Sequence, residues 1–405
     1  MVLLLVAFAV FNPEPLADES GHHLSAIRQF AGGDWSWPQD LVMWPTYHVV
    51  ASLPARLFGA DVFVLRAFSA LMTVGALWLL FSATRHVDWP APSDALLHFA
   101  WHPILFPFSV LVYTEPAGML CVLGGVYLHV RRQYAWSAVA VFMACLIRQS
   151  NVVWLVLMMA WGLSDLWDER VRSAKARRAP GLWRGVYRLR WHLVFLVASA
   201  VVFATLEGFA ITSVAENRVQ FNIAQFYLFG LFVVLLWLPV WLVRWPGDVT
   251  VIARWAAGHT GVSALLGLAV LTAIGVSIAE FSNPHTWNNN DNYFRNFPLQ
   301  LMDASIPVRA VAVVLMLMFT PTIVRFSLAQ PTRRMLALTW VFSLLFLVPH
   351  SLVEPRYYIV PVFFLNFFAC YTPREARRLT IWYGVLSAAV GTAFVIGASS
   401  EGGVW

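Results

Sequence analysis

The sequence predicts an all-α polytopic membrane protein, and three observations lead to that prediction. Of the 405 residues, 60% are hydrophobic and only 12% are charged, and the mean hydropathy is +0.67. Such values lie far outside those of an ordinary soluble domain. The apolar runs suit helices of about 20 residues and are too long for outer-membrane strands of about ten. We therefore expect one integral membrane domain over residues 1–405.

Alternating the apolar runs across a bilayer gives about thirteen transmembrane helices. The first run, residues 1–12, lacks a basic n-region and a cleavage site, so we interpret it as a short or truncated span and not a signal peptide. Two short runs, 135–148 and 151–167, are candidates for broken or re-entrant helices. The other expected spans are 62–83, 94–111, 117–130, 192–212, 221–243, 258–280, 307–325, 335–350, 357–371 and 379–397.

The net charge of +6 comes mainly from connections that fall on one side of this arrangement. An excess of Lys and Arg marks the cytoplasmic side of a membrane protein, and such charge also attracts anionic lipids at about 1 kcal/mol per residue. The membrane therefore explains the charge, and no nucleic-acid partner is implied. For each basic run the favoured interpretation is a solvated connecting face, and binding of lipid headgroups is the alternative. The basic connections are Arg131-Arg132, residues 170–190, Arg333-Arg334 and residues 374–378.

Neither a disulfide framework nor a metal site is expected. Cys121, Cys145 and Cys370 all lie inside apolar runs, as small buried side chains do. The carboxylates are not clustered with the spacing of a divalent-ion site. We therefore predict no metal and no cofactor.

The loop between the first two spans contains a pair of carboxylates, Asp18 and Glu19. Leu24, Ile27 and Phe30 follow at helical spacing, which predicts a short amphipathic helix at the membrane interface. A carboxylate near an acceptor hydroxyl is suited to general base catalysis. Asp18 is the first candidate and Glu19 the close alternative; helix capping by Asp18 and a dipole interaction of Glu19 would explain the pair without catalysis.

Two further polar positions lie at span boundaries on the same side. Tyr113 and Glu115 precede Pro116 at a helix entrance, where capping or acceptor binding would explain the carboxylate. Arg148 interrupts an apolar stretch, and an arginine there is costly enough to suggest function. Its planar guanidinium suits a lipid phosphate, although snorkelling to the interface is an equal alternative.

Two loops complete the set of polar candidates. The Asn-rich loop that contains Asp291 and Arg295 offers groups for sugar hydroxyls, but such runs also form turns. Arg356 and Tyr357 stand beside Glu354 at the entrance of a span, where an ion pair with Glu354 or an aromatic belt would explain them.

Four strings of the sequence, in this order, resemble a known glycosyltransferase family. They are similar to Asp-Glu-x-x-His, Tyr-Thr-Asp, Arg-Gln-Thr-Asn-Ile-Ile-Trp and Glu-Phe-Arg-Tyr-Tyr-Ile-Leu-Pro of the dolichyl-phosphoglucose-dependent α-1,2-glucosyltransferases. Those enzymes add the last glucose to the lipid-linked oligosaccharide for N-glycosylation. The matching strings here are Asp18-Glu19-x-x-His22, Tyr113-Thr114-Glu115, Arg148-Gln149-Ser150-Asn151-Val152-Val153-Trp154 and Glu354-x-Arg356-Tyr357-Tyr358-Ile359-x-Pro361.

The resemblance also has departures. The family's stretch of Gly-Asp, Asn-His and His-Pro-Gln type is represented only loosely by residues 288–300. Trp37-Pro38 stands where the family has Trp-Asp-Pro. These differences leave the acceptor specificity open.

The resemblance implies a GT-C fold and an inverting transfer from a polyprenyl- or dolichyl-phosphate sugar at the non-cytoplasmic face. The expected substrates are a glucose donor of this type and a lipid-linked glycan acceptor. The membrane would be the endoplasmic reticulum if the host is eukaryotic and the inner membrane if it is bacterial. The expected site residues are Asp18 and Glu19 for catalysis; Arg148, Arg356 and His22 for the donor phosphate; and Glu115, Tyr113, Gln149, Asn151, Asp291, Arg295 and Tyr357 for the acceptor or sugar.

Two alternatives remain open from the sequence. Another GT-C enzyme, such as a mannosyl- or arabinosyltransferase, would use the same kinds of residue as the base and for phosphate binding. A transporter or channel-associated protein would also have many spans and arginines at the membrane edge. It would require paired ionisable residues deep in several helices or repeated halves with interrupted spans, and neither is clear in the sequence.

Overall fold

The computed structural model of the chain describes residues 2–16, 19–38, 41, 43–87, 92–175, 182–205, 221–283, 297–347, 350 and 352–398. Every regular element within these residues is a helix, and no strand occurs among them. The prediction of an all-helical protein is therefore confirmed. The assignment of the whole chain to one domain stays a prediction.

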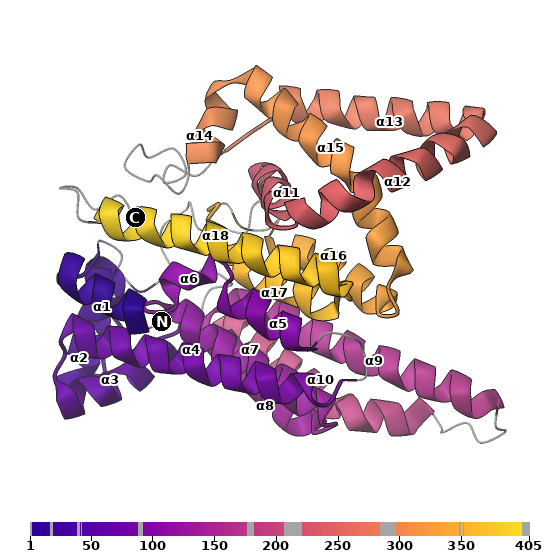
Figure 1. Cartoon of the computed structure of the whole chain (residues 1–405). Coiled ribbons are helices and arrows are strands. Elements are labelled where there is room, and N and C mark those ends of the chain that lie inside the picture. Colours follow the sequence, from indigo (N-terminus) through magenta and orange to yellow (C-terminus); the bar gives the residue numbers. More distant parts are fainter. Residues whose placement is uncertain are drawn as a thin grey trace.

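A bundle of neighbouring helices makes up much of the lower group in Figure 1. Neighbouring helices of this group contact one another along α4–α7, α7–α8, α8–α10 and α9–α10. The α7–α8 contact is close because Gly125 has no side chain: a Cβ there would lie 2.3 Å from Cγ2 of Val141. The helices are α4 (Val62–Thr84), α7 (Thr114–Val130), α8 (Tyr134–Ile147), α9 (Val152–Lys175) and α10 (Leu182–Thr205).

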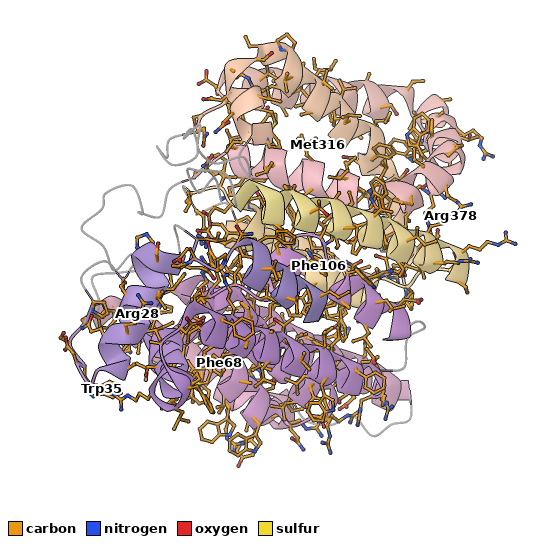
Figure 2. The ribbon with its side chains drawn as sticks, turned by 60° about the vertical axis from the view of Figure 1, so that its left-hand side comes forward. Arg28, Trp35, Phe68, Phe106, Met316 and Arg378 are labelled. Atoms are coloured by element: carbon orange, nitrogen blue, oxygen red, sulfur yellow. The ribbon has the colours of Figure 1, made fainter. Side chains whose placement is uncertain are left out.

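A second group lies above it in Figure 1, and α18 (Pro373–Ala398) runs between the two. Helix α18 contacts α5 (Pro92–Ala100) on one side and α12 on the other. Figure 2 shows Met316 of α15 within the upper group and Phe106 near α18. The upper helices are α11 (Ala224–Leu236), α12 (Leu238–Gly258), α13 (Thr260–Ala279), α14 (Phe297–Ala304) and α15 (Ile306–Ala329). Helices α16 (Arg333–Leu347) and α17 (Ile359–Phe368) contact each other, and they pack against α9 and α5 respectively.

Within the described residues, four helices are long and apolar enough to cross a membrane, or five if the bent pair α11–α12 is one span. The expected thirteen spans are therefore not confirmed. The run 221–243 is not one straight helix, because α11 and α12 meet at 87°. Pro239 stands in the first turn of α12, where its missing N–H costs no helical hydrogen bond, and a proline in this position favours the start of a new helix.

The expected span 94–111 is also divided. Its residues form α5 and a one-turn helix, α6 (Leu105–Phe108), with a break between them. Pro103 lies in this break, and it disfavours helical backbone at His102. The prediction of a single helix over this run is therefore wrong.

The first loop is helical over the residues where a short amphipathic helix was predicted, and it contains a further helix, α3, that was not predicted. After α1 (Val2–Phe11), a π-helix (Glu19–Leu24) leads into α2 (Ser25–Ala31), and α3 (Thr46–Phe58) follows. The apolar side of the predicted amphipathic helix packs inside the protein against residues of α3 and α4. Its placement at a lipid interface is not confirmed.

Some helices expose apolar side chains that water would not favour. On α13, Leu265, Leu268 and Leu271 are 70%, 63% and 66% exposed. Exposed apolar surface on this scale marks a site of interaction with a membrane or another protein. Together with the apolar helices, it fits a membrane protein.

Candidate functional site

Three strings that are far apart in the sequence meet in one polar cluster. The Arg148 guanidinium donates a hydrogen bond of 2.7 Å to Oε1 of Glu115. Nε of Arg356 lies 3.6 Å from the same oxygen. Arg356 is also paired with Glu354, and this confirms the ion pair that the sequence suggested. The cluster therefore contains two cations and two anions.

Two tyrosines hold the arginines in place. The Arg148 guanidinium lies over the ring of Tyr357 at 4.9 Å from its centroid. Arg356 lies over the rings of Tyr113, at 5.1 Å, and Tyr357, at 5.9 Å. Cation–π contacts of this kind are worth about 0.5–2 kcal/mol each. They orient the guanidinium planes before any ligand arrives.

The position of Arg148 follows from a break between two helices. Helix α8 ends at Ile147, and Arg148 is extended with φ −144° and ψ 122°. A 3-10 turn, Gln149–Asn151, then leads into α9. Asn151 fixes this turn by donating 2.9 Å to the carbonyl oxygen of Ala144. The Arg148 side chain therefore extends into the cluster from the turn between α8 and α9, and it does not snorkel along a helix.

The cluster is largely buried, but its two arginines keep some contact with solvent. The side chains of Arg148 and Arg356 are 18% and 12% exposed, and that of Glu115 is 5% exposed. Among the described residues, the Glu115 bond is the one hydrogen bond of the Arg148 guanidinium, which carries five N–H donors. The Gln149 side chain is buried, and its Nε2 has no hydrogen-bond partner within the described part of the chain. A buried donor without a partner needs a physical explanation, and a ligand is one.

Helix α7 places the carboxylate of this cluster. It begins at Thr114, directly after the extended Tyr113, so Glu115 lies in its first turn as predicted. Glu115 pairs with Arg148, and Tyr113 makes no capping side-chain hydrogen bond. The carboxylate therefore binds an arginine and is not explained by helix capping.

A pair of buried histidines borders the cluster. Nδ1 of His23 and Nε2 of His48 are 2.9 Å apart, and the His23 ring lies 5.3 Å from that of Tyr113. Burial, the neighbouring His48 and the arginines hold the pKa of His23 well below its ordinary value. Burial lowers the pKa of His48 to about 3. Both rings are therefore neutral at neutral pH, with one nitrogen donating to the other.

His22, which the sequence favoured, lies on the exposed side of the π-helix, whereas His23 is buried. Helical phase could have identified His23. It precedes the buried Ile27 and Phe30 by four and seven residues, and such spacing places side chains on one helix face. A π-helical turn is itself frequent at functional sites.

Glu19 lies outside this cluster of arginines and forms a separate buried ion pair. Arg66 donates to its Oε2 at 2.5 Å and to its Oε1 at 3.2 Å. The backbone N–H groups of Leu16 and Val112 donate to the same carboxylate at 2.9 and 2.8 Å. Both side chains are at most 1% exposed. Four donors occupy Glu19, which favours a structural role for it.

Sequence reasoning missed Arg66, although a signal was present. It is the one charged residue in the apolar run 62–83, and a charge within such a run usually has a specific partner. Arg66 also donates to the carbonyl oxygens of Asn12 and Glu14 at 2.6 and 3.1 Å. It therefore ties the first loop to α4.

Three predicted site residues, Asp18, Asp291 and Arg295, lie outside the described residues. Their predicted roles stay predictions. Within the described ranges, no group of three or more His, Cys, Asp or Glu side chains is arranged to hold a metal ion.

A model of the DIE2/ALG10 family matches residues 12–367. The chain belongs to this family. Its DIE2/ALG10 relatives include proteins named Dol-P-Glc:Glc(2)Man(9)GlcNAc(2)-PP-Dol alpha-1,2-glucosyltransferase. One from Arabidopsis thaliana is 28% identical over 175 residues, which are 38% of this chain and 34% of the relative. One from Homo sapiens is 27% identical over 228 residues, which are 50% of this chain and 48% of the relative.

The chain thus spans between a third and a half of the length of the DIE2/ALG10 relatives that it matches. No solved structure matches it. The family assignment confirms the resemblance that the four sequence strings suggested.

Proposed function

We propose that this chain transfers glucose from a polyprenyl- or dolichyl-phosphate donor to a hydroxyl of a lipid-linked glycan, forming an α-1,2 linkage with inversion. The observation that carries the proposal is the convergence of Arg148 and Arg356 on Glu115, over the ring of Tyr357. The names of the relatives supply the donor and acceptor classes.

The chemistry requires a base and a stabilised leaving group. The acceptor oxygen forms a bond to C1 of the sugar while the bond from C1 to the phosphate oxygen breaks. The electron pair of that bond goes to the phosphate, and the acceptor proton goes to a carboxylate. Asp18 is the proposed base, because the oxygens of Glu19 already accept from Arg66 and two backbone N–H groups.

The arginines would stabilise the charge that develops on the departing phosphate. Fixed donors in a shielded site are worth several kcal/mol to such a transition state, and guanidinium groups match phosphate oxygens in geometry. Arg148 has donors available among its described contacts, and Gln149 has a buried amide nitrogen without a partner there. The proposal requires no metal ion, and transfer should persist in excess chelator.

The site would face the non-cytoplasmic side of the membrane. Glu115 lies in the first turn of α7, and the basic turn Arg131-Arg132 follows the last turn. Two of the basic connections lie together, since Glu169 pairs with both Arg132 and Arg188. Under the positive-inside rule, that end is cytoplasmic and the arginine cluster is at the other end.

The test is transfer of radiolabelled glucose from polyprenyl-phosphoglucose to a lipid-linked glycan by the purified full chain in detergent. We expect Asp18→Asn to abolish transfer while thermal stability and donor binding persist. Glu14→Gln is the matched control, because Glu14 is an exposed acid in the same loop, and it should retain activity.

A mannose donor tested in parallel separates this function from that of another GT-C enzyme. Transfer of mannose in preference to glucose would replace the proposed donor. Folded wild-type protein that transfers neither sugar would refute the proposal. Full activity of Asp18→Asn would refute the assignment of the base.

A further inference from the structure

A groove at the basic end of the bundle lies far from the arginine cluster. It has a volume of about 460 Å³ and is formed by the α7–α8 turn together with the α10 segment around residues 187–191. Small-ligand pockets have volumes of roughly 300–1,000 Å³. Helix α7 has 17 residues, so its two ends are about 25 Å apart at a rise of 1.5 Å per residue. The groove is therefore a separate site from the one around Glu115.

The groove combines positive charge with aromatic rings. Its lining includes Arg132, Arg188 and Arg190 together with Trp136, Tyr187 and Trp191, and it includes no acidic residue. Glu169, just outside, pairs with Arg132 and Arg188 at 3.1 Å each. A second carboxylate, Asp165, acts on Tyr134 of the lining together with Glu169. Three guanidinium groups beside two carboxylates leave a net charge of about +1 for an anionic ligand.

Arg190 is held in position without an acidic partner among the described residues. Its guanidinium lies 3.5 Å from the ring centroid of Tyr187, and NH1 donates 2.9 Å to the Tyr187 carbonyl oxygen. A guanidinium that is stacked on a ring loses little freedom when it binds an anion. Phosphate oxygens are the partners that such a planar fork matches best.

An apolar stripe on α10 continues from the groove. Val194, Val197 and Val201 follow at helical spacing and are 49%, 54% and 56% exposed. Trp136 and Tyr187 are each 65% exposed at the charged end of this stripe. The charged groove matches the phosphate headgroup of a phospholipid. The aromatic side chains match its glycerol region, and the apolar stripe matches its acyl chains.

We propose that this groove binds the headgroup of an anionic glycerophospholipid, whose acyl chains lie along the exposed valines of α10. The lipid is distinct from the sugar donor, because the groove and the arginine cluster lie at opposite ends of α7. The phosphodiester accepts from Arg188 and Arg190. The bound lipid anchors the α7–α8 turn to the membrane surface.

The experiment measures binding of fluorescent phosphatidylglycerol and phosphatidylcholine to the purified full chain in detergent micelles. We expect tighter binding of phosphatidylglycerol, and a loss of about 25-fold in Arg188→Gln/Arg190→Gln, since each arginine contributes about fivefold at a membrane surface. Arg377→Gln/Arg378→Gln is the matched control, because it removes two exposed arginines from α18. Figure 2 shows Arg378 at the end of α18, away from Arg28 and Trp35.

Three results would overturn the proposal: equal affinity for the two lipids, an equal loss in the control variant, or displacement of the lipid by excess inorganic phosphate. The last result would identify a site for soluble anions. The single variant Arg190→Gln guards against loss of folding, because Arg190 makes no ion pair with a described acid. It should retain the wild-type unfolding temperature and lose about fivefold in affinity.

Discussion

The ion pair between Glu19 and Arg66 offers the sharpest test of the structure. Glu19 accepts four hydrogen bonds, two from Arg66 and two from backbone N–H groups. Removal of one partner from a buried pair costs about 3–5 kcal/mol, because the other charge stays buried without compensation. Glu19→Gln retains one acceptor oxygen, and Arg66 retains the carbonyl oxygens of Asn12 and Glu14. We therefore expect Glu19→Gln to lower the free energy of unfolding by about 3 kcal/mol, the low end of this range.

The assay is thermal unfolding of the purified protein in detergent, with transfer activity measured on the same samples below the transition. At about 2 °C per kcal/mol, Glu19→Gln should lower the unfolding temperature by about 6 °C. Glu19→Ala should lower it further, since the N–H groups of Leu16 and Val112 also lose their acceptor. The double variant Glu19→Gln/Arg66→Met should be less destabilised than the sum of the single variants, because it leaves no lone charge.

One result would refute this reasoning. If Glu19→Gln unfolds at the wild-type temperature and loses transfer activity, Glu19 is the base, and its hydrogen bonds serve to position it for catalysis. A lower unfolding temperature with transfer retained at low temperature would assign it the structural role.

Three further predictions follow from other parts of the structure. Arg148→Lys should lower kcat about tenfold or more with a smaller effect on the donor KM, because lysine lacks the planar fork that would stabilise the charge developing on the departing phosphate; an unchanged kcat would contradict that role. His23 and His48 have pKa values lowered by burial. Above the unfolded value of about 6.5 both are neutral in the folded and unfolded states; as the pH falls, the unfolded chain gains protons first, so both lower the stability, and His48, with a folded pKa of about 3, should cost about 2 kcal/mol by pH 5. The unfolding temperature of His48→Gln should therefore fall less between pH 7 and pH 5 than that of the wild type, and an equal fall in the two proteins would contradict this prediction. Gly125→Ala should cost about 1–3 kcal/mol, since its Cβ would lie 2.3 Å from a valine methyl of α8; Gly267→Ala, with open space around it, is the control, and equal unfolding temperatures of the two variants would contradict the close α7–α8 contact.

Several helices could be predicted closely because their physical cause is local. The apolar runs around α4, α7 and α8 predicted helices whose bounds differ by only a few residues from those observed. Their length and hydrophobicity depend on neighbouring residues alone. The divided run 94–111 and the bend between α11 and α12 were not predicted, because hydrophobic content does not show whether an apolar run that contains a proline is one helix or two.

The candidate site was predictable in its parts and not in its assembly. The strings around Glu115, Arg148 and Arg356 were each identified, and the pairing of Arg356 with Glu354 was foreseen. That Arg148 and Arg356 share Glu115 was not. Sequence order contains no distance between residues 115, 148 and 356, so only helix packing could bring them together.

The sequence by itself determined that the chain is helical and rich in apolar helices, and which polar strings interrupt its apolar runs; it also predicts that the basic connections fall on one side of the membrane. These properties follow from composition and local spacing. The tertiary structure decided that Glu19 is bound by Arg66, that His23 and not His22 faces the arginine cluster, and that a basic groove adjoins an apolar stripe on α10. Each of these depends on which helices touch, because burial and pairing are properties of packed side chains and not of their order along the chain.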